Sequence, residues 1–211
     1  MKKYFLIFFF ILFVVFVHFY GLNPRLWHIP AAGVSSANNL PVVAVTDEPY
    51  QNMILYPTEI TVRWGYHIKA LATYSITARV LGVKDYSSSA EGGLIPLDIA
   101  LGWKRMADAH IVDQYSISQS GRWYEWRYSA APPIPDREVE TSSANTHIIP
   151  ADSEIYRKLK NVGVGHIVNL RGYLVEASTP DGWHWSSSLT RDDVGEGSCE
   201  LMFVQSADVL N

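Results

Sequence analysis

The tract from Ser116 to Tyr128 is the densest group of polar and aromatic side chains in the sequence. If this tract is extended, Arg122, Tyr124 and Trp126 lie on one face, because side chains alternate between the two faces of a strand. A guanidinium beside aromatic rings can hold an anion, and the rings can stack on a sugar or a base. The same pattern is also typical of a core strand with an ion pair on its outer face. These three residues are therefore candidate ligand-binding residues.

A second polar and aromatic group covers residues 182–193. On a strand, Trp183 and Trp185 point one way and His184 points the other, and Arg191 falls in the loop that follows. Loops that a rigid sheet holds in place commonly carry binding groups. The pattern fits a polar ligand, and it fits the end of a hairpin equally well. His184 and Arg191 complete the set of candidate ligand-binding residues.

His147 is the best single candidate for a general base, because imidazole titrates near neutral pH. A histidine that bonds to backbone beside a helix start explains the same residue. Cys199 would need His147 or His184 within bonding reach to act as a nucleophile. Its alternation with apolar neighbours predicts a buried core thiol instead.

Asp108, His110 and Asp113 offer oxygen and imidazole ligands to a divalent ion, but such spacing is common by chance. We expect no metal and no cofactor. The chain contains no phosphate-binding loop, dinucleotide fingerprint or hydrolase motif.

The elements that would position these residues are mostly strands. Alternating apolar and polar residues predict strands near residues 60–64, 72–80, 111–118 and 122–128. Residues 97–109 are expected to form a short helix, and a second helix should begin at Asp152 or Ser153 and run to about Asn161. The last third predicts a β-meander, with a turn at 179–182 and strands at 166–177, 183–189 and 198–205. The fold class is mostly β (α+β), a small β-barrel or meander with one or two short helices.

The N-terminus predicts a membrane segment. Two lysines precede a run that is apolar from Tyr4 to Tyr20 apart from His18. The run is short for a membrane span, but no pair of small residues follows it at the spacing that signal cleavage needs. We expect an uncleaved anchor over residues 4–22 with its N-terminus in the cytoplasm, and the alternative is a cleaved signal. A proline-rich extended linker is expected over 23–57, and a β-rich domain outside the cytoplasm over 58–211.

Composition restricts the possible partners. The chain has 17 basic and 21 acidic residues; without Lys2 and Lys3, the remainder carries a charge near −6. Binding to nucleic acid depends on clustered Lys and Arg, so nucleic acid is not expected. The single cysteine excludes an internal disulfide and a cysteine-based zinc site.

Several tracts together resemble a group of bacterial membrane-anchored proteins with no assigned activity: Asp98–Trp103, Arg122–Tyr128, His147–Ala151 and Gly182–Arg191. The resemblance covers about residue 74 to the C-terminus. It implies a bacterial envelope setting and supplies no catalytic residue. Together with the expected anchor, it predicts a protein of the bacterial inner membrane with its C-terminal domain periplasmic or extracellular.

Two functions remain open at this point. The first is a binding or interaction module of the cell envelope, without catalysis, for a glycan, a peptide or a partner protein. The second is an envelope hydrolase acting on a phosphoester or glycan bond, with His147 as general base and Arg122 or Arg191 stabilising the developing anion.

Overall fold

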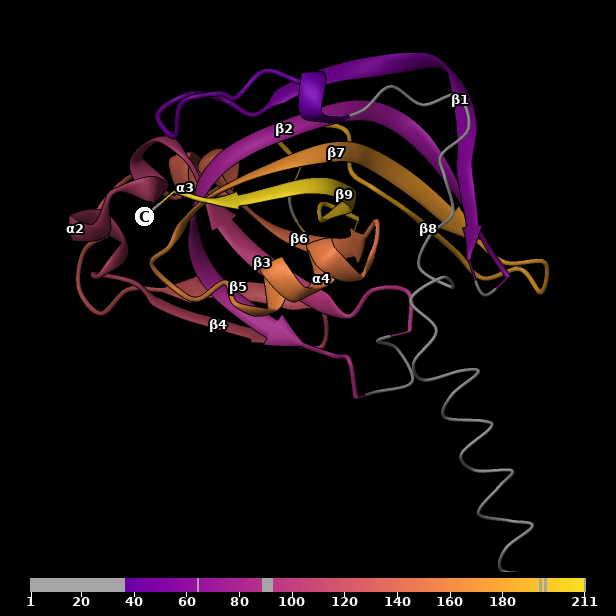
Figure 1. Ribbon diagram of the computed structural model, residues 1–211. Coiled ribbons are helices and arrows are strands. Elements are labelled where there is room, and N and C mark those ends of the chain that lie inside the picture. Colours follow the sequence, from indigo (N-terminus) through magenta and orange to yellow (C-terminus); the bar gives the residue numbers. More distant parts are fainter. Residues whose placement is uncertain (1–36, 64, 89–92, 194, 196, 211) are drawn as a thin grey trace, which may run out of the picture.

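The computed structural model describes residues 37–63, 65–88, 93–193, 195 and 197–210 (Figure 1). The expected anchor at 4–22 and the first part of the expected linker lie outside these residues. Among the described residues, no helix is both long enough and apolar enough to cross a membrane.

The fold is mostly β with few helices, as the sequence predicts. The strands are β1 Tyr50–Arg63, β2 Tyr66–Asp85, β3 Leu97–Gly102, β4 Ser116–Ser120, β5 Trp123–Arg127, β6 Ser143–Pro150, β7 Ile167–Ser178, β8 His184–Ser186 and β9 Glu200–Val209. The helices are α2 Ala109–Val112, α3 Asp136–Ser142 and α4 Ser153–Lys160, with short 3-10 turns at Ala37–Asn39 and Lys104–Ala107.

Five strands pair into a closed barrel in the order β2-β3-β6-β9-β7, and β7 pairs back to β2. The long strand β2 makes this closure possible, because it curves around the barrel and pairs with β7 along one side and with β1 and then β3 along the other (Figure 1). All neighbours in the ring are antiparallel except β6 and β9, which are parallel. Gly172 lies at a bulge between β7 and β9, and a Cβ there would fall 1.9 Å from the Phe203 carbonyl oxygen.

The barrel interior forms the main core. Alternate residues of the strands point inward, and α4 contributes Ile155 and Leu159 to the same cluster. The Asp152 carboxylate caps this helix by accepting from the backbone N–H groups of Glu154 (2.8 Å) and Ile155 (2.9 Å). The predicted helix from about Asp152 to Asn161 is therefore confirmed, as is the turn at 179–182, where Gly182 has φ +98°.

Other expectations are wrong. Residues 97–102 form strand β3 rather than a helix. Every one of these residues is buried, so the sequence does not show the alternation of apolar and polar residues that marks a strand with one exposed face. The expected strand at 111–118 contains the end of α2 and the start of β4. The last three strands are not a meander, since β9 pairs with β7 and β6 and not with β8.

The described part of the expected linker packs on the domain. Residues 50–57 belong to β1, which pairs with β2. Before that strand, Glu48 accepts a hydrogen bond from the Trp103 indole at 3.0 Å, and the Lys104 N–H donates to the Val45 carbonyl at 2.8 Å. The folded part of the chain therefore begins before residue 58.

Candidate functional site

The β4–β5 hairpin lies against the outer face of the barrel, over β2, β3 and β6 (Figure 1). Gln119 donates to the Asn145 side-chain oxygen at 2.8 Å, and the Asn145 amide donates to the Arg122 carbonyl at 2.9 Å. Gly82 on β2 makes room for this contact, because a Cβ there would lie 2.4 Å from the Gln119 Oε1. The hairpin thus covers the side chains that β3 and β6 present away from the barrel interior.

The hairpin turn carries Arg122 into this interface. Ser120 pairs with Trp123, so Gly121 and Arg122 form a two-residue turn, and both have positive φ, +56° and +70°. Such turns match the twist of the strands, but a non-glycine residue in the left-handed region costs about 1 kcal/mol or more. Arg122 is therefore a turn residue that precedes β5. The expectation that it shares a strand face with Tyr124 and Trp126 is wrong.

Arg122, Asp98 and His147 form a buried charged cluster. The Asp98 Oδ1 accepts from Arg122 Nη1 at 2.7 Å and lies 2.9 Å from His147 Nδ1. Asp98 and His147 are each only 1% exposed, and they are paired residues of β3 and β6. The Arg122 guanidinium also donates to the Ile95 carbonyl at 3.0 Å and stacks 3.7 Å from the centre of the Tyr86 ring. This network offsets the strain of the turn.

His147 lines a cavity of about 440 Å³, which we call the histidine cavity. Its walls include Arg122, Trp123, His184 and Cys199. The contact between Asp98 and His147 Nδ1 fixes the orientation of the imidazole. The centre of the imidazole ring lies 4.5 Å from the centre of the Trp185 ring. A carboxylate on one ring nitrogen is the arrangement that orients a general base.

A second cavity of about 350 Å³ adjoins the first and shares Arg122 and Trp185 with it. We call it the tryptophan cavity. Trp183 meets Tyr66 edge to face at a ring distance of 5.3 Å and lies 6.3 Å from Trp185. Its wall is largely aromatic, and Arg122 is the one charged residue among the described residues that line it.

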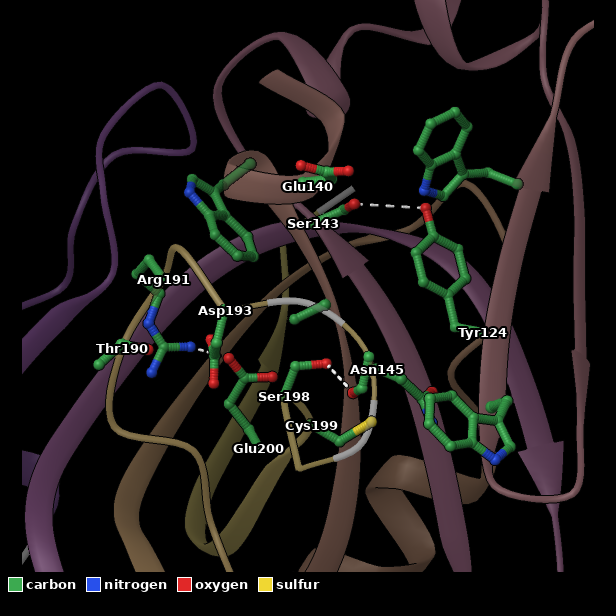
Figure 2. A pocket seen from close by; sticks show the side chains of 15 residues that line it. Tyr124, Glu140, Ser143, Asn145, Thr190, Arg191, Asp193, Ser198, Cys199 and Glu200 are labelled. Atoms are coloured by element: carbon green, nitrogen blue, oxygen red, sulfur yellow. Dashed lines mark hydrogen bonds and ion pairs between the residues drawn. The ribbon is translucent and has the colours of Figure 1, made fainter. Parts of the chain in front are cut away.

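The third cavity, the hairpin cavity, has a volume of about 220 Å³ and shares Trp123 and Cys199 with the histidine cavity. Figure 2 shows Tyr124 on one side of it and Arg191 on the other. Tyr124 donates to the Ser143 hydroxyl at 3.3 Å, and burial raises the pKa of Tyr124 to about 12. Trp126 also lines this cavity, and its ring stacks on Tyr128 at 6.3 Å.

Arg191 is held in the wall by two elements. It forms an ion pair with Glu200 at the start of β9, and it donates to the Gln51 side-chain oxygen of β1 at 3.0 Å. Glu200 is 2% exposed. The guanidinium lies 5.5 Å from the centre of the buried Tyr74 ring. Burial is the main reason that the pKa of Tyr74 is raised.

The structure therefore groups the sequence candidates in two places. Arg122, His147 and His184 line the histidine cavity, and Tyr124, Trp126 and Arg191 line the hairpin cavity. His184 is exposed and pairs with Glu176 at 3.3 Å.

Sequence reasoning missed Asp98, Asn145 and Glu200 as parts of the site. Asp98 had a signal, because a carboxylate within the otherwise apolar segment 94–101 must find a partner when it is buried. Glu200 had a similar signal, because it stands at the start of an apolar strand. Asn145 had none, since its contacts join segments distant in sequence.

Cys199 differs from the expectation of a core thiol. It precedes β9, is half-buried, and lines both the histidine and the hairpin cavities. Burial raises the pKa of its thiol to about 11, with Asp98 and Asp193 contributing. The thiol is therefore protonated at neutral pH, and an attack by sulfur would need a base to remove the proton.

Of the three residues considered as metal ligands, Asp108 has a structural role. The Asp108 side chain caps α2 by accepting from the His110 N–H at 2.9 Å. Among the described residues there is no group of three or more His, Cys, Asp or Glu side chains that could hold a metal ion.

Comparison with known proteins gives no name for this arrangement: no family model, curated protein or solved structure matches the chain.

Proposed function

We propose that the chain is a membrane-anchored, extracytoplasmic binding module of the bacterial cell envelope, and that its ligand is a glycan. The ligand lies across the three adjoining cavities between the β4–β5 hairpin and the loop after β8. The observation that carries this proposal is that indole rings line all three cavities. The arginines in the walls, Arg122 and Arg191, are already paired with carboxylates of the protein.

The aromatic walls support a ligand with flat apolar faces and polar edges. Trp123 and Trp183 are 45% and 39% exposed, although indoles of this size usually become buried. Ser186 lines the histidine cavity and Thr190 the hairpin cavity, and Trp123 lines both. A sugar ring offers an apolar face for stacking and hydroxyl groups for hydrogen bonds, which matches both kinds of wall.

The charges argue against nucleic acid. Arg122 is bound to Asp98 and Arg191 to Glu200, so these guanidinium groups are neutralised before a phosphate arrives. Each pair would have to exchange a buried carboxylate for a phosphate, which leaves a carboxylate unpaired. The net charge of the chain is −4, which adds to this argument.

The strand order also supports a binding function. Along the chain, β2, β3, β6, β7 and β9 are the five barrel strands, and α4 lies between the third and the fourth. This connectivity is that of the OB-fold, in which the face of the second and third strands and the flanking loops bind oligonucleotides and oligosaccharides. The hairpin and its cavities lie on the corresponding strands, β3 and β6. The analogy supports the location, and the side chains support the ligand class.

The envelope setting rests on the sequence. The apolar run at 4–22 and the excess of lysine before it favour a single span with the domain outside the cytoplasm. The resemblance to bacterial membrane-anchored proteins favours the same setting.

The test is co-sedimentation of the full chain, kept in detergent, with purified bacterial cell-wall glycan. Trp123→Ala and Trp183→Ala should each lower the affinity about tenfold, because one stacked ring contributes about 1–3 kcal/mol. Tyr56→Ala is the matched control, since Tyr56 is 85% exposed on β1 and lines none of the three cavities. Equal binding by all three variants and the wild type would refute ligand binding by the aromatic walls of the three cavities.

The Asp98–His147 pair favours a second function, hydrolysis of a phosphoester or glycan bond with His147 as general base. In that case the wild type should release reducing ends or phosphate from the bound polymer, and a folded His147→Asn variant should bind it without cleavage. A wild-type protein that binds and releases nothing would leave the binding function alone.

A further inference from the structure

The hairpin cavity has an excess of negative charge. Its walls contain the carboxylates of Glu140, Asp193 and Glu200, and Arg191 is the one basic residue among the described residues that line it. Figure 2 shows Glu140 on a different side of the hollow from Asp193 and Glu200. A ligand in this cavity therefore meets carboxylates from more than one direction.

Glu200 is the most deeply buried of these carboxylates. It is 2% exposed, and its Oε1 pairs with Arg191. Its other oxygen, Oε2, is buried and has no hydrogen-bond partner among the described residues. The charge on this oxygen is compensated only in part, and it attracts a cation in the adjoining cavity through the low-dielectric wall.

The other two carboxylates also keep capacity for a donor. Within the described part of the chain, Asp193 accepts a hydrogen bond from the Ser188 hydroxyl at 2.6 Å. Glu140 forms an exposed ion pair with Arg137 at 3.3 Å, which water screens. An ionised carboxylate can accept about four hydrogen bonds.

The donor that fits is an ammonium group. It supplies three N–H donors and the positive charge that the walls lack, and the neighbouring rings of Trp123, Tyr124 and Trp126 attract cations. The cavity volume of about 220 Å³ is below the ~300 Å³ at which pockets for larger organic molecules begin. It therefore suits one sugar unit.

We propose that the hairpin cavity binds a hexosamine unit with a free amine, so that the module prefers de-acetylated, cationic amino-sugar polymers. This inference rests on the proposed glycan-binding function and names its ligand class. An N-acetyl group removes the charge, and a phosphate or carboxylate on the sugar is repelled by the same walls.

The experiment is calorimetry on the full chain in detergent at about pH 6, where the amine is charged. The probes are a tetramer of β-1,4-linked glucosamine and its fully N-acetylated counterpart. The glucosamine tetramer should bind about tenfold tighter or better, and salt at about 0.5 M should remove most of this preference. In Glu140→Gln/Asp193→Asn most of the preference for the glucosamine tetramer should be lost, and Glu200 accounts for what remains. Glu125→Gln should change nothing, because Glu125 is exposed on the hairpin and lines none of the three cavities.

The outcomes separate the two proposals. Equal or tighter binding of the acetylated tetramer refutes the amine site and leaves glycan binding intact, and so does a preference that is undiminished in the double variant. Failure of both tetramers and of cell-wall glycan refutes the proposed function itself. Tighter binding of tetralysine than of tetraglucosamine would assign the site to a cationic peptide and overturn the proposal.

Discussion

At the scale of single residues, the site depends on charges that are buried in pairs. Asp98 and Glu200 are each almost fully buried, and each pairs with an arginine from another element. Burying an ion pair contributes little net stability, but removing one partner leaves a charge without compensation. The pairs therefore hold the hairpin and the loop after β8 in specific positions.

Arg122→Met should lower the free energy of unfolding by about 3 kcal/mol or more, because Asp98 then loses its cationic partner. Arg127→Met is the matched control: Arg127 pairs with Glu125 on the exposed face of the hairpin, so its loss should cost less than about 1 kcal/mol. Urea denaturation of the three proteins checks this. Similar losses in both variants would contradict a structural role for the buried cluster.

Cys199 gives a prediction that depends on pH. Because burial raises the thiol pKa to about 11, about one molecule in a thousand carries the thiolate at pH 8. A disulfide reagent should label the native protein about a hundredfold more slowly than the protein in guanidinium. The native rate should rise about tenfold for each pH unit between 7 and 9. A native rate equal to the unfolded one would show that the thiol is exposed and unperturbed.

At the scale of elements, close backbone approach sets where the strands and the hairpin lie. Gly172 lets the backbones of β7 and β9 approach at the bulge, and Gly82 lets Gln119 reach Asn145 beneath the hairpin. The two glycines differ in what would have to move: backbone at Gly172, and the end of a side chain at Gly82.

Gly172→Ala should therefore destabilise the fold by about 3 kcal/mol or more, and Gly82→Ala by only about 1 kcal/mol, the value of one displaced hydrogen bond. Gly163→Ala is the control, since its Cβ would meet only the His166 ring, at 3.8 Å. Thermal unfolding followed by circular dichroism measures all three. If Gly82→Ala proved the more harmful, Gln119 would be rigidly held.

At the scale of the whole molecule, barrel closure places the functional segments together. Strand β9 lies between β6 and β7, so the loop that carries Arg191 ends beside the strand that carries His147. The hairpin is inserted between β3 and β6 and folds back over both. Segments from residues 66 to 200 thus meet around one set of cavities, although the barrel interior itself is filled by apolar side chains.

The sequence predicted the features that local chemistry controls. The strands at 72–80 and 166–177, the Asp152 cap of α4 and the turn at Gly182 each follow from residues a few positions apart, and all are confirmed. Arg122, His147, Tyr124 and Arg191 were identified because their residue types can bind ligands, and all four line cavities. Whether they bind one remains a prediction.

The tertiary structure decided what those residues can do. Strand β3 was missed because burial on both faces removes the alternation that marks a strand. Asp98 took its role only when pairing with β6 brought it beside His147, 49 positions away. Residue types are local, but the pairing of charges and the closing of cavities depend on contacts between distant strands. The sequence by itself therefore determined which groups are available, and the closed barrel decided which of them neutralise one another and which face a ligand.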